Sequence, residues 1–375
     1  MHWALFDDGD DFLPLTYSRP VWDLRVGILT LREKWQYLVP EIFAVAQGRL
    51  KELFNHSPPL GDCIYVSGRC FPEHEFVRRL KEDLAPGEGF VDEEGKVLAF
   101  RACGFPSDFR PSTYTGAYRL RQIADIFLYN GKEIASDVQG MISAGVEDSH
   151  TVVYAPENVF VHPAAKIKAA VLDAESGPIY IGPNVQIQIG AMIQGPAALC
   201  KGAVANVGVK IRPDTTVGPY CKVGGEISNS VLWGYSNKAH DGFLGNSVLG
   251  AWCNLGADTN VSNLKNNYST VRVRHVASGL ERDTGLQFCG LTMGDHSKSG
   301  INTMFNTGTV VGVSANVFGA GFPPKYIPSF TWGEGEIFDL EKATEVAKRV
   351  CARRDHVFGP ADERLFRAIF EAEGR

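Results

Sequence analysis

The chain has 375 residues, of which 44% are hydrophobic and 21% are charged, and its formal net charge is −6. This length allows two domains with their own cores, and the composition is ordinary for a globular protein. The acidic balance and the lack of a basic cluster argue against nucleic acid as a partner. No stretch approaches the roughly 18 apolar residues of a membrane span, and the N-terminus lacks the pattern of a secretory leader. We therefore expect a cytoplasmic protein without a membrane partner.

The eight cysteines are scattered along the chain without a CxxC pair. Paired or clustered spacing is typical of disulfide frameworks and zinc sites. We expect these cysteines to be reduced side chains that pack in the core.

Residues 1–148 mix short apolar runs with helical patterns, which is typical of an α/β domain. The apolar runs Trp3–Phe6 and Ile64–Val66 predict buried strands. The apolar spacing predicts helices over Leu31–Leu38, Glu73–Leu84 and Tyr118–Tyr129.

A six-residue apolar period starts in the middle of the chain and fits neither a helix nor a simple alternating strand. The first track of this period is Ile181, Ile187, Ile193, Leu199, Ala205, Ile211, Val217 and Val223. A second track, four residues further on in each hexad and mostly small, is Val185, Ala191, Ala197, Ala203, Val209, Thr215, Cys221 and Ile227. Two tracks with this period predict a hexapeptide β-helix, in which each coil buries its apolar face only against its neighbours.

Two further tracts continue the period over residues 149–332, the predicted β-helix domain. One runs through Val231, Phe243, Leu249, Leu255 and Val261, and the other through Met293, Ser299, Phe305, Val311 and Val317. Between them, residues 264–282 break the period and predict a projecting loop or hairpin. Residues 333–375 form a tail with helical spacing over Phe338–Arg353 and Ala361–Glu373, which we expect to cap the open end of the solenoid.

Three segments of the β-helix carry a family resemblance: VKIRPDTTVG, SNKAHDGFLG and NLGADTNVSN, all within residues 209–263. Together with residues 283–303, they resemble the acetyltransferase half of the bifunctional sugar-1-phosphate nucleotidylyltransferase / amino-sugar-phosphate N-acetyltransferases, a family that includes N-acetylglucosamine-1-phosphate uridylyltransferase. The resemblance implies a left-handed parallel β-helix, acetyl-CoA as co-substrate and a homotrimer. It predicts a transferase of nucleotide-sugar synthesis that acts on a sugar phosphate and a nucleotide.

The same resemblance implies roles for individual residues. His240 would be the general base, since a histidine near neutral pH can take the proton of an amine. The substrate contacts would be Arg212, Lys238, Phe243, Asn254 and Asn263, and the acetyl-CoA contacts would be Ala257 and Asn302. The chain departs from the family at Phe243, where a tyrosine is usual, and at Gly224 or Gly225, where a lysine is common. From the residues alone, histidine and asparagine also occur in β-helix turns without any catalytic role.

The segment FLPLTYSRPVWDLRVG at residues 12–27 resembles the opening of a sugar nucleotidyltransferase. The resemblance implies that Arg19 contacts the nucleotide and that Asp7 and Asp8 hold Mg²⁺ for nucleotidyl transfer. Three features differ from the family: FDDGDDF replaces the glycine-rich loop, Val21 replaces a lysine, and Arg69 stands where a metal-binding aspartate is usual.

Two alternatives remain open at this point. The diverged N-terminal motifs are compatible with a catalytically silent protein that binds a nucleotide sugar as a sensor or scaffold. A zinc enzyme built on hexapeptide repeats would need paired histidines on adjoining coils, and His240 and His296 lie far apart in the sequence.

Overall fold

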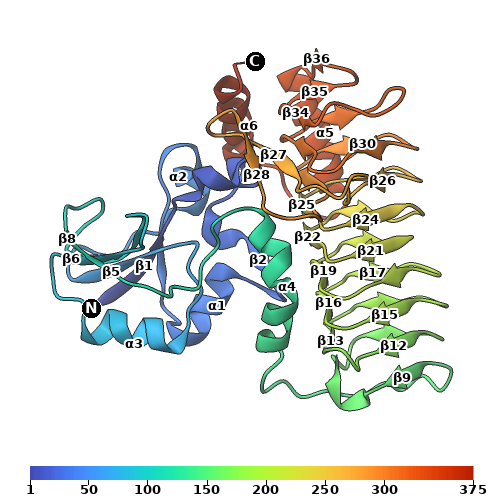
Figure 1. Cartoon of the computed structure of the whole chain (residues 1–375), viewed down its shortest axis with the longest axis horizontal. Coiled ribbons are helices and arrows are strands. Elements are labelled where there is room, and N and C mark those ends of the chain that lie inside the picture. The colour runs from blue at the N-terminus through green and yellow to red at the C-terminus, as the bar shows by residue number, and fades with distance from the viewer. Residues whose placement is uncertain (375) are drawn as a thin grey trace. The chain divides into compact units, whose positions relative to one another are not determined.

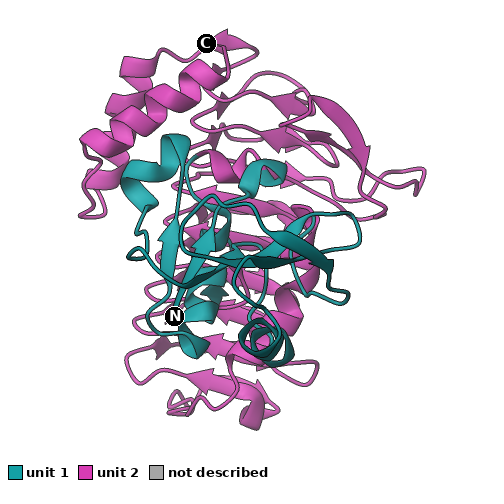
Figure 2. Cartoon of the chain, turned by 90° about the vertical axis from the view of Figure 1, so that its left-hand side faces the viewer, with its two compact units in different colours: residues 1–12, 18–24, 29–121 teal, residues 13–17, 25–28, 122–375 magenta. Residues whose placement is uncertain are grey.

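The computed structural model describes residues 1–374 and divides the chain into two compact units (Figure 2). The first unit comprises residues 1–12, 18–24 and 29–121, and the second comprises residues 13–17, 25–28 and those from 122 onward. The domain bounds 1–148, 149–332 and 333–375 stay predictions. Among the described residues, no helix has both the length and the apolar character needed to cross a membrane.

The first unit is an α/β domain built on a mixed sheet. In order across the sheet, the strands are β4 (Phe43–Val45), β1 (His2–Phe6), β5 (Cys63–Ser67), β7 (Val97–Ala102), β6 (Glu88–Val91) and β8 (Arg110–Thr113). Strand β1 runs parallel to both β4 and β5, whereas β7 is antiparallel to β5 and β6. The unit also contains the short strand β3 (Leu29–Thr30) and the helices α1 (Leu31–Leu38), α2 (Lys51–Phe54) and α3 (His74–Glu82).

Local sequence explains where α1 begins. The Thr30 hydroxyl accepts from the Glu33 amide at 3.2 Å, and the Glu33 carboxylate accepts from the Thr30 amide at 2.7 Å. This capping box satisfies two backbone donors at the start of the helix.

The predicted helices at 31–38 and 73–84 are confirmed, but the one predicted from Tyr118 begins later, as α4 (Ala124–Asp137). Residues 119 and 120 are extended instead, because the Leu120 amide donates to the Arg69 carbonyl at 3.0 Å.

The second unit is a three-sided parallel β-helix whose coils stack from β9 to β36 (Figure 1). The first face contains β10 (Val159–Val161), β13 (Ile179–Ile181), β16 (Ala197–Leu199), β19 (Thr215–Val217), β22 (Val231–Gly234), β25 (Val248–Ala251), β29 (Thr292–Met293), β32 (Val310–Val311) and β34 (Tyr326–Ile327). The second face contains β11 (Lys166–Ile167), β14 (Gln186–Ile187), β17 (Val204–Ala205), β20 (Lys222–Val223), β23 (Asn237–Lys238), β30 (Lys298–Ser299), β33 (Asn316–Val317), β35 (Thr331–Trp332) and β36 (Glu336–Ile337). The third face contains β9 (Val152–Tyr154), β12 (Val171–Asp173), β15 (Met192–Gln194), β18 (Lys210–Ile211), β21 (Glu226–Ser228), β24 (Phe243–Gly245), β26 (Asn260–Val261) and β31 (Met304–Phe305). The left-handed sense of the coil stays a prediction.

The interior of the prism confirms the hexad pattern. All sixteen residues of the two tracks between positions 181 and 227 are 1% exposed or less. The pattern fails at two positions: Leu232 joins the core in place of Val231, and the fully buried Leu244 joins it in place of Phe243, which is half-buried. Successive side chains of a strand point to opposite sides, so the hexad residue of this coil is Leu244, and Phe243 faces outward.

Helix α4 packs against the first face of the β-helix, beside β16, β19 and β22. The Asn130 side-chain oxygen accepts from the Gly27 amide at 2.7 Å and from the Thr216 hydroxyl at 3.1 Å. The Asn130 amide group donates to the Asp214 carbonyl at 2.9 Å. One buried asparagine therefore joins the helix, the β2 segment (Arg25–Val26) and the prism.

Three edges connect the faces, and each has its own character. The aromatic edge, between the first and second faces, carries Tyr220, Tyr235, Trp252 and His296. The histidine edge, between the second and third faces, carries His240. The loop edge, between the third and first faces, carries the predicted hairpin as antiparallel strands β27 (Arg272–His275) and β28 (Leu280–Asp283).

The tail forms helices α5 (Leu340–Ala352) and α6 (Pro360–Ala372), as predicted, but the expectation that they cap the open end is wrong. They pack along the aromatic edge: Cys351 of α5 joins a buried cluster with Trp252, and Phe366 of α6 contacts His296 at 5.2 Å between ring centroids. Strand β36 pairs antiparallel with β35 in the last coil. The reason is apolar burial, since the column of rings offers the helices more apolar surface than a polar turn does.

Candidate functional site

His240 lies exposed on a turn of the histidine edge, between β23 and β24. The turn is held by its carbonyl groups rather than by the imidazole. The side-chain amide of Asn206 donates to the Ala239 carbonyl at 2.8 Å, and the Asp258 amide donates to the Asp241 carbonyl at 3.1 Å. An exposed imidazole on a fixed turn is free to meet a ligand.

Lys238 lies directly beneath this turn and is fully buried. Its ammonium group donates to the carbonyl of Asp241 at 2.8 Å, to that of Gly224 at 3.5 Å, and to that of His240. Burial lowers the pKa of Lys238 to about 8, and the charges of Asp241 and Asp258 partly oppose that shift. A side chain in this position cannot touch a sugar phosphate from solvent. The geometry gives Lys238 a supporting place under the His240 turn rather than the substrate contact that the resemblance implies.

Gly224 and Gly225 lie below the same turn, where the family resemblance led us to note a missing lysine. A Cβ atom on Gly224 would lie 2.5 Å from the Ala239 carbonyl oxygen, and Gly225 has a positive φ of 70°. Only glycine leaves room for the turn and accepts that backbone conformation without strain. These glycines are therefore part of how the edge holds His240.

Ala257 and Asn302 lie further up the histidine edge, on the next two coils. The Asn302 amide donates to the Ala257 carbonyl at 2.8 Å, so the structure brings the two expected acetyl-CoA contacts together. Since Asp258 bonds to Asp241, the turns that carry His240, Ala257 and Asn302 form one continuous column.

Arg212 and Phe243 are both associated with the third face. The Arg212 guanidinium lies 3.7 Å from the carboxylate of Glu226, whose strand position is paired with Phe243. Arg212 and Glu226 also line a shallow pocket together with Lys210 and Met192. This surface combines a cation, a carboxylate and apolar side chains, a mixture that suits a polar ligand with a non-polar ring face.

Asn254 and Asn263 lie apart from each other. Asn254 is on the second face, bridged to Asn237 and Lys298, and its side chain accepts from Asn237 at 3.5 Å. Asn263 is at the loop edge, where its side chain donates to the Asn246 side chain at 2.8 Å. The expected substrate contacts are thus divided between the second face and the side formed by the third face and the loop edge.

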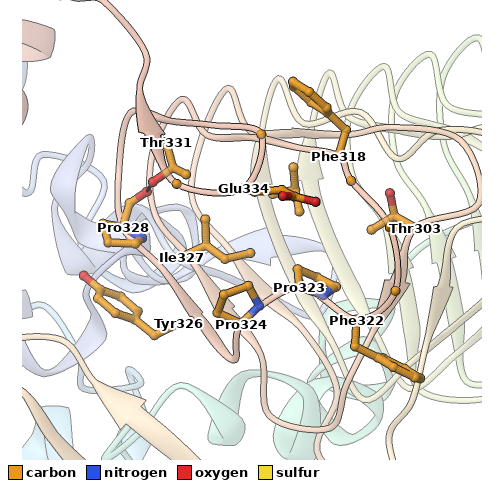
Figure 3. A pocket seen from close by; sticks show the side chains of 16 residues that line it. Thr303, Phe318, Phe322, Pro323, Pro324, Tyr326, Ile327, Pro328, Thr331 and Glu334 are labelled. Carbon is orange, nitrogen blue, oxygen red and sulfur yellow. Dashed lines mark hydrogen bonds between the residues drawn. The ribbon is translucent and has the colours of Figure 1, made fainter.

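An apolar pocket of about 360 Å³ opens beside Thr303, the neighbour of Asn302 (Figure 3). Phe318, Phe322 and Tyr326 lie around it, and Glu334 brings a carboxylate to its wall. Residues 319–324 form one side of the pocket. They include glycines and two prolines, which are typical turn residues. Neither Asn302 nor Ala257 lines this pocket, which comes nearest to them in the sequence at Thr303.

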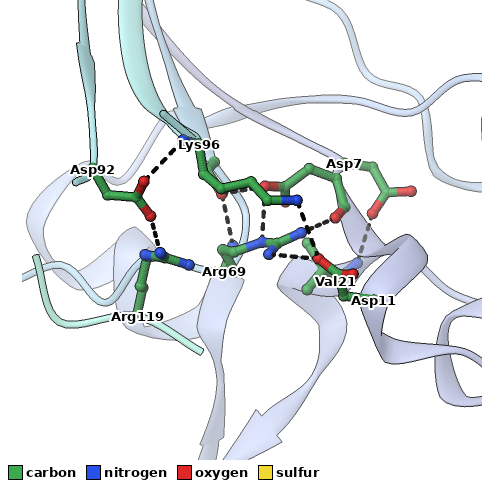
Figure 4. A network of polar contacts seen from close by, with 9 residues as sticks. Asp7, Asp11, Val21, Arg69, Asp92, Lys96 and Arg119 are labelled. Atoms are coloured by element: carbon green, nitrogen blue, oxygen red, sulfur yellow. Dashed lines mark hydrogen bonds and ion pairs between the residues drawn. The ribbon is translucent and has the colours of Figure 1, made fainter. Parts of the chain in front are cut away.

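The acidic loop, Asp7–Phe12, follows strand β1 in the first unit and forms a polar network (Figure 4). Asp8 accepts from the Ser67 hydroxyl at 2.8 Å and pairs with Arg69 Nε at 2.8 Å, and Arg69 also reaches Asp11 at 3.3 Å. Asp7 accepts from the Val21 amide at 2.9 Å. Burial raises the pKa of Asp7 to about 6 and also raises the pKa of Asp8.

This network does not fit the Mg²⁺ site implied for Asp7 and Asp8. A guanidinium already pairs with the carboxylates of the loop, and Mg²⁺ needs near-octahedral oxygen ligands. Among residues 1–374, no cluster of three or more His, Cys, Asp or Glu side chains could hold a metal ion. Arg19 lies half-buried close by in the sequence, two residues before Val21, and its nucleotide contact stays a prediction.

Comparisons with known proteins find a family match in the N-terminal part of the chain. Residues 3–144 match the sugar nucleotidyl transferase family. An uncharacterized acetyltransferase, YaiX from Escherichia coli O6:K15:H31, is 27% identical over 164 residues, covering 43% of this chain and 70% of that protein. A bifunctional sugar-1-phosphate nucleotidylyltransferase/acetyltransferase from Sulfurisphaera tokodaii is 28% identical over 166 residues, covering 44% of this chain and 40% of that protein. The bifunctional protein GlmU of Corynebacterium glutamicum is 29% identical over 252 residues, covering 61% of this chain and 50% of that protein.

These similarities confirm the resemblance found in the sequence, and with it the expectation of a transferase of the sugar-nucleotide pathway. They give no support to a catalytically silent scaffold. The alignments span half or less of the two bifunctional relatives.

Two features of the sites were not predicted from the sequence. The first is the pairing of Arg69 with Asp8 and Asp11, for which the replacement of an expected aspartate by arginine was the available signal. The second is the burial of Lys238, for which the adjoining Gly224–Gly225 pair was the signal, since it makes room for a close-packed turn.

Proposed function

We propose that this chain transfers the acetyl group of acetyl-CoA to the amine of an amino-sugar phosphate, with His240 as general base. The observation that carries the proposal is the column of turns on the histidine edge. The exposed imidazole of His240 and the Ala257–Asn302 pair lie on consecutive coils of that edge. The base and the thioester site that acetyl transfer requires can therefore lie side by side.

In the proposed reaction, the neutral amine nitrogen of the sugar attacks the carbonyl carbon of the thioester. His240 takes the proton that the nitrogen loses, and the carbon–sulfur bond breaks to release coenzyme A. Histidine is the side chain most often used to accept a proton in a reaction at neutral pH. Backbone amides of neighbouring turns are candidates to stabilise the oxyanion.

The pocket beside Thr303 supports a site for the pantetheine arm of acetyl-CoA. It is lined mainly by apolar side chains such as Phe318 and Phe322, and by Thr303, which follows Asn302 in the sequence. A cofactor site of this kind is typically a mostly apolar cleft with a few polar groups that fix orientation.

The division of the substrate contacts supports a homotrimer, the assembly that we propose. Asn254 lies on the second face, whereas Arg212 extends the third face. Contacts from two faces can meet one ligand if neighbouring copies supply them, and three identical copies around a threefold axis form a closed ring of that kind. Exposed apolar side chains would be covered in such contacts: Ile189, Val207 and Ile301 on the histidine edge, and Tyr154, Met192 and Met304 on the third face.

We also propose that the first unit binds the nucleotide or sugar-phosphate part of a nucleotide sugar. The match of residues 3–144 to the sugar nucleotidyl transferase family supports this part of the proposal. None of the eight cysteines, which all lie among the described residues, forms a disulfide, and this suits the reducing cytoplasm that we propose as the location.

The test is a mass-spectrometric screen with the purified full chain. One arm supplies acetyl-CoA with a panel of amino-sugar phosphates, and matched sugar phosphates without an amine serve as controls. A second arm supplies nucleoside triphosphates with sugar 1-phosphates. We expect an acetylated product and free coenzyme A only where the substrate has an amine. If no amino-sugar phosphate in the panel is acetylated, the acetyl-transfer proposal fails.

A further inference from the structure

We propose that the guanidinium of Arg69 is the resident cation of the acidic loop Asp7–Phe12, and that this loop works without a divalent metal ion. Arg69 and the loop belong to the first unit, whereas the acetyl-transfer site proposed above belongs to the second. The carboxylates of the loop do not make the contacts that the implied Mg²⁺ ligands would need.

Arg69 makes contacts that a bound cation would make. Its Nε lies 2.8 Å from Asp8 Oδ2, its Nη1 lies 3.3 Å from Asp11 Oδ2, and its Nη2 donates to the Asp8 carbonyl. Its side chain is only 5% exposed, and its guanidinium carbon lies 5.2 Å from the centre of the Phe12 ring. One cation therefore contacts two carboxylates, a carbonyl oxygen and an aromatic face (Figure 4).

The backbone holds Arg69 in this position from both sides. The Gly68 amide donates to the Phe6 carbonyl at 2.9 Å, and the Leu120 amide donates to the Arg69 carbonyl at 3.0 Å. A Cβ atom on Gly68 would lie 2.9 Å from the Val21 side chain, so the chain passes too close there for any larger residue without a shift. The end of β5 thus presents the guanidinium to the loop at a fixed place beside the end of β1.

The other partners of the loop leave little for a metal ion. Asp8 Oδ2 also accepts from Ser67, Asp11 Oδ2 lies 3.6 Å from the Lys96 ammonium, and Asp7 accepts from a backbone amide. A metal ion that took Asp8 and Asp11 would leave Arg69 buried and without its counter-charges, and a guanidinium does not lose its proton to escape that cost.

One buried carboxylate oxygen of the network could still accept a hydrogen bond. Asp8 Oδ1 is buried and has no hydrogen-bond partner among the described residues. Because Arg69 holds the other oxygen of the same carboxylate, a second cation at Oδ1 would be repelled. A hydroxyl or amide donor of a ligand suits this oxygen better. The loop can therefore accept a hydrogen-bond donor at Asp8 Oδ1, while Asp8 Oδ2 and Asp11 Oδ2 are already paired with Arg69.

The test is a titration of the full chain with Mn²⁺ alone, in which electron paramagnetic resonance measures the free ion. The variants are Arg69→Gln, which removes the resident charge, Arg69→Lys, which keeps a charge, and Asp8→Asn, which removes a carboxylate. Circular dichroism reports whether each variant is folded.

We expect the wild type and Asp8→Asn to take up the same background amount of Mn²⁺. We expect Arg69→Gln to bind one Mn²⁺ ion at least about tenfold more tightly than the wild type does. The double variant with Asp8→Asn should lose that gain. Arg69→Lys should bind Mn²⁺ as the wild type does. One equivalent of Mn²⁺ bound by the wild type and lost in Asp8→Asn overturns the proposal. A folded Arg69→Gln with no gain also overturns it. If Arg69→Gln does not fold, the comparison of wild type with Asp8→Asn decides alone.

Discussion

The ammonium group of Lys238 donates a 2.8 Å hydrogen bond to the backbone carbonyl of Asp241, three residues along the chain. The bond ties the end of β23 to the far side of the turn that carries His240. The same group also reaches the carbonyl of Gly224 on the preceding coil. A buried cation therefore fixes, from inside the prism, the position of the residue that we propose as general base.

Replacement of Lys238 by methionine is expected to destabilise the fold by about 2 kcal/mol. The drop of its pKa from 10.5 to about 8 corresponds to a burial penalty of roughly 3 kcal/mol, which methionine would relieve. Methionine also removes the donor to three carbonyls, which costs about 1–3 kcal/mol for each carbonyl left unpaired. This cost is larger than the burial penalty that methionine relieves. Urea unfolding measures the difference, and Lys201→Met, an exposed lysine on another turn, should change stability by less than about 0.5 kcal/mol.

The cost of Lys238→Met should also depend on pH in one direction. Because the folded-state pKa is lower than the unfolded value, the native state loses the proton first, and the contribution of Lys238 to stability rises between about pH 8 and 10.5. The difference in unfolding free energy between wild type and Lys238→Met is expected to be constant below pH 8 and to increase above it. A gap that narrows above pH 8 would contradict the burial of a charged ammonium.

Replacement of Asp7 by asparagine is expected to stabilise the fold by about 1–2 kcal/mol at pH 7.5. Burial raises the pKa of Asp7 from 3.8 to about 6, so the native state resists ionisation, and the penalty is fully present above pH 6 and disappears below pH 4. The amide oxygen of asparagine can still accept from Val21. Urea unfolding at pH 7.5 and pH 4 measures the gain, with Asp10→Asn, an exposed neighbour, as the matched control. Equal effects of the two substitutions would argue against a buried charge at Asp7.

Trp252 is expected to anchor the tail helices to the aromatic edge. It stacks on Tyr235 with 4.2 Å between ring centroids and joins the cluster that contains Cys351 of α5. Trp252→Ala should cost about 3 kcal/mol, as for other large-to-small changes in a core, and should speed amide exchange in α5 and α6. Trp332→Ala, at a tryptophan that is 42% exposed, should leave exchange in these helices unchanged. Slow exchange in both variants would show that other contacts hold the tail.

Val207 is expected to lie in a contact between copies of the chain. It is 70% exposed on the histidine edge, and removal of an apolar side chain from water in a contact with a partner is favourable. Val207→Asp should convert the proposed trimer to monomers, which light scattering after size-exclusion chromatography measures. Val357→Asp, at a valine that is 81% exposed in the tail, should leave the mass unchanged. A wild-type chain that is monomeric at all concentrations would rule out the assembly.

The architecture could be predicted because the hexad pattern is local and repeats. Residues such as Ile193 and Ala203 must face the interior once every coil has the same length. Phe243 was misjudged because the coil lengths change there, and a shift of one residue turns a side chain from the core to the surface. The inward residue is Leu244, which is fully buried.

The details of the sites could not be predicted, because they depend on contacts between distant parts of the chain. Arg69 is 61 residues from the carbonyl of Asp8 that it binds, and an arginine in place of an expected aspartate does not show which residue it contacts. Lysine is usually a surface residue, so the burial of Lys238 becomes visible only when the turn at Gly224 is placed beneath it. The aromatic edge has no simple period either, since the spacing between Tyr235, Trp252 and His296 is uneven.

The central claim is that His240 is the base of an acetyl transfer, and the rate of coenzyme A release from acetyl-CoA tests it most directly. The measurement compares wild type, His240→Ala and His150→Ala, the last being an exposed histidine outside the histidine edge, with the amino-sugar phosphate found in the screen. We predict that His240→Ala lowers the rate by about 100-fold or more, without loss of stability, and that His150→Ala matches the wild type. A rate for His240→Ala equal to that of the wild type would contradict the claim.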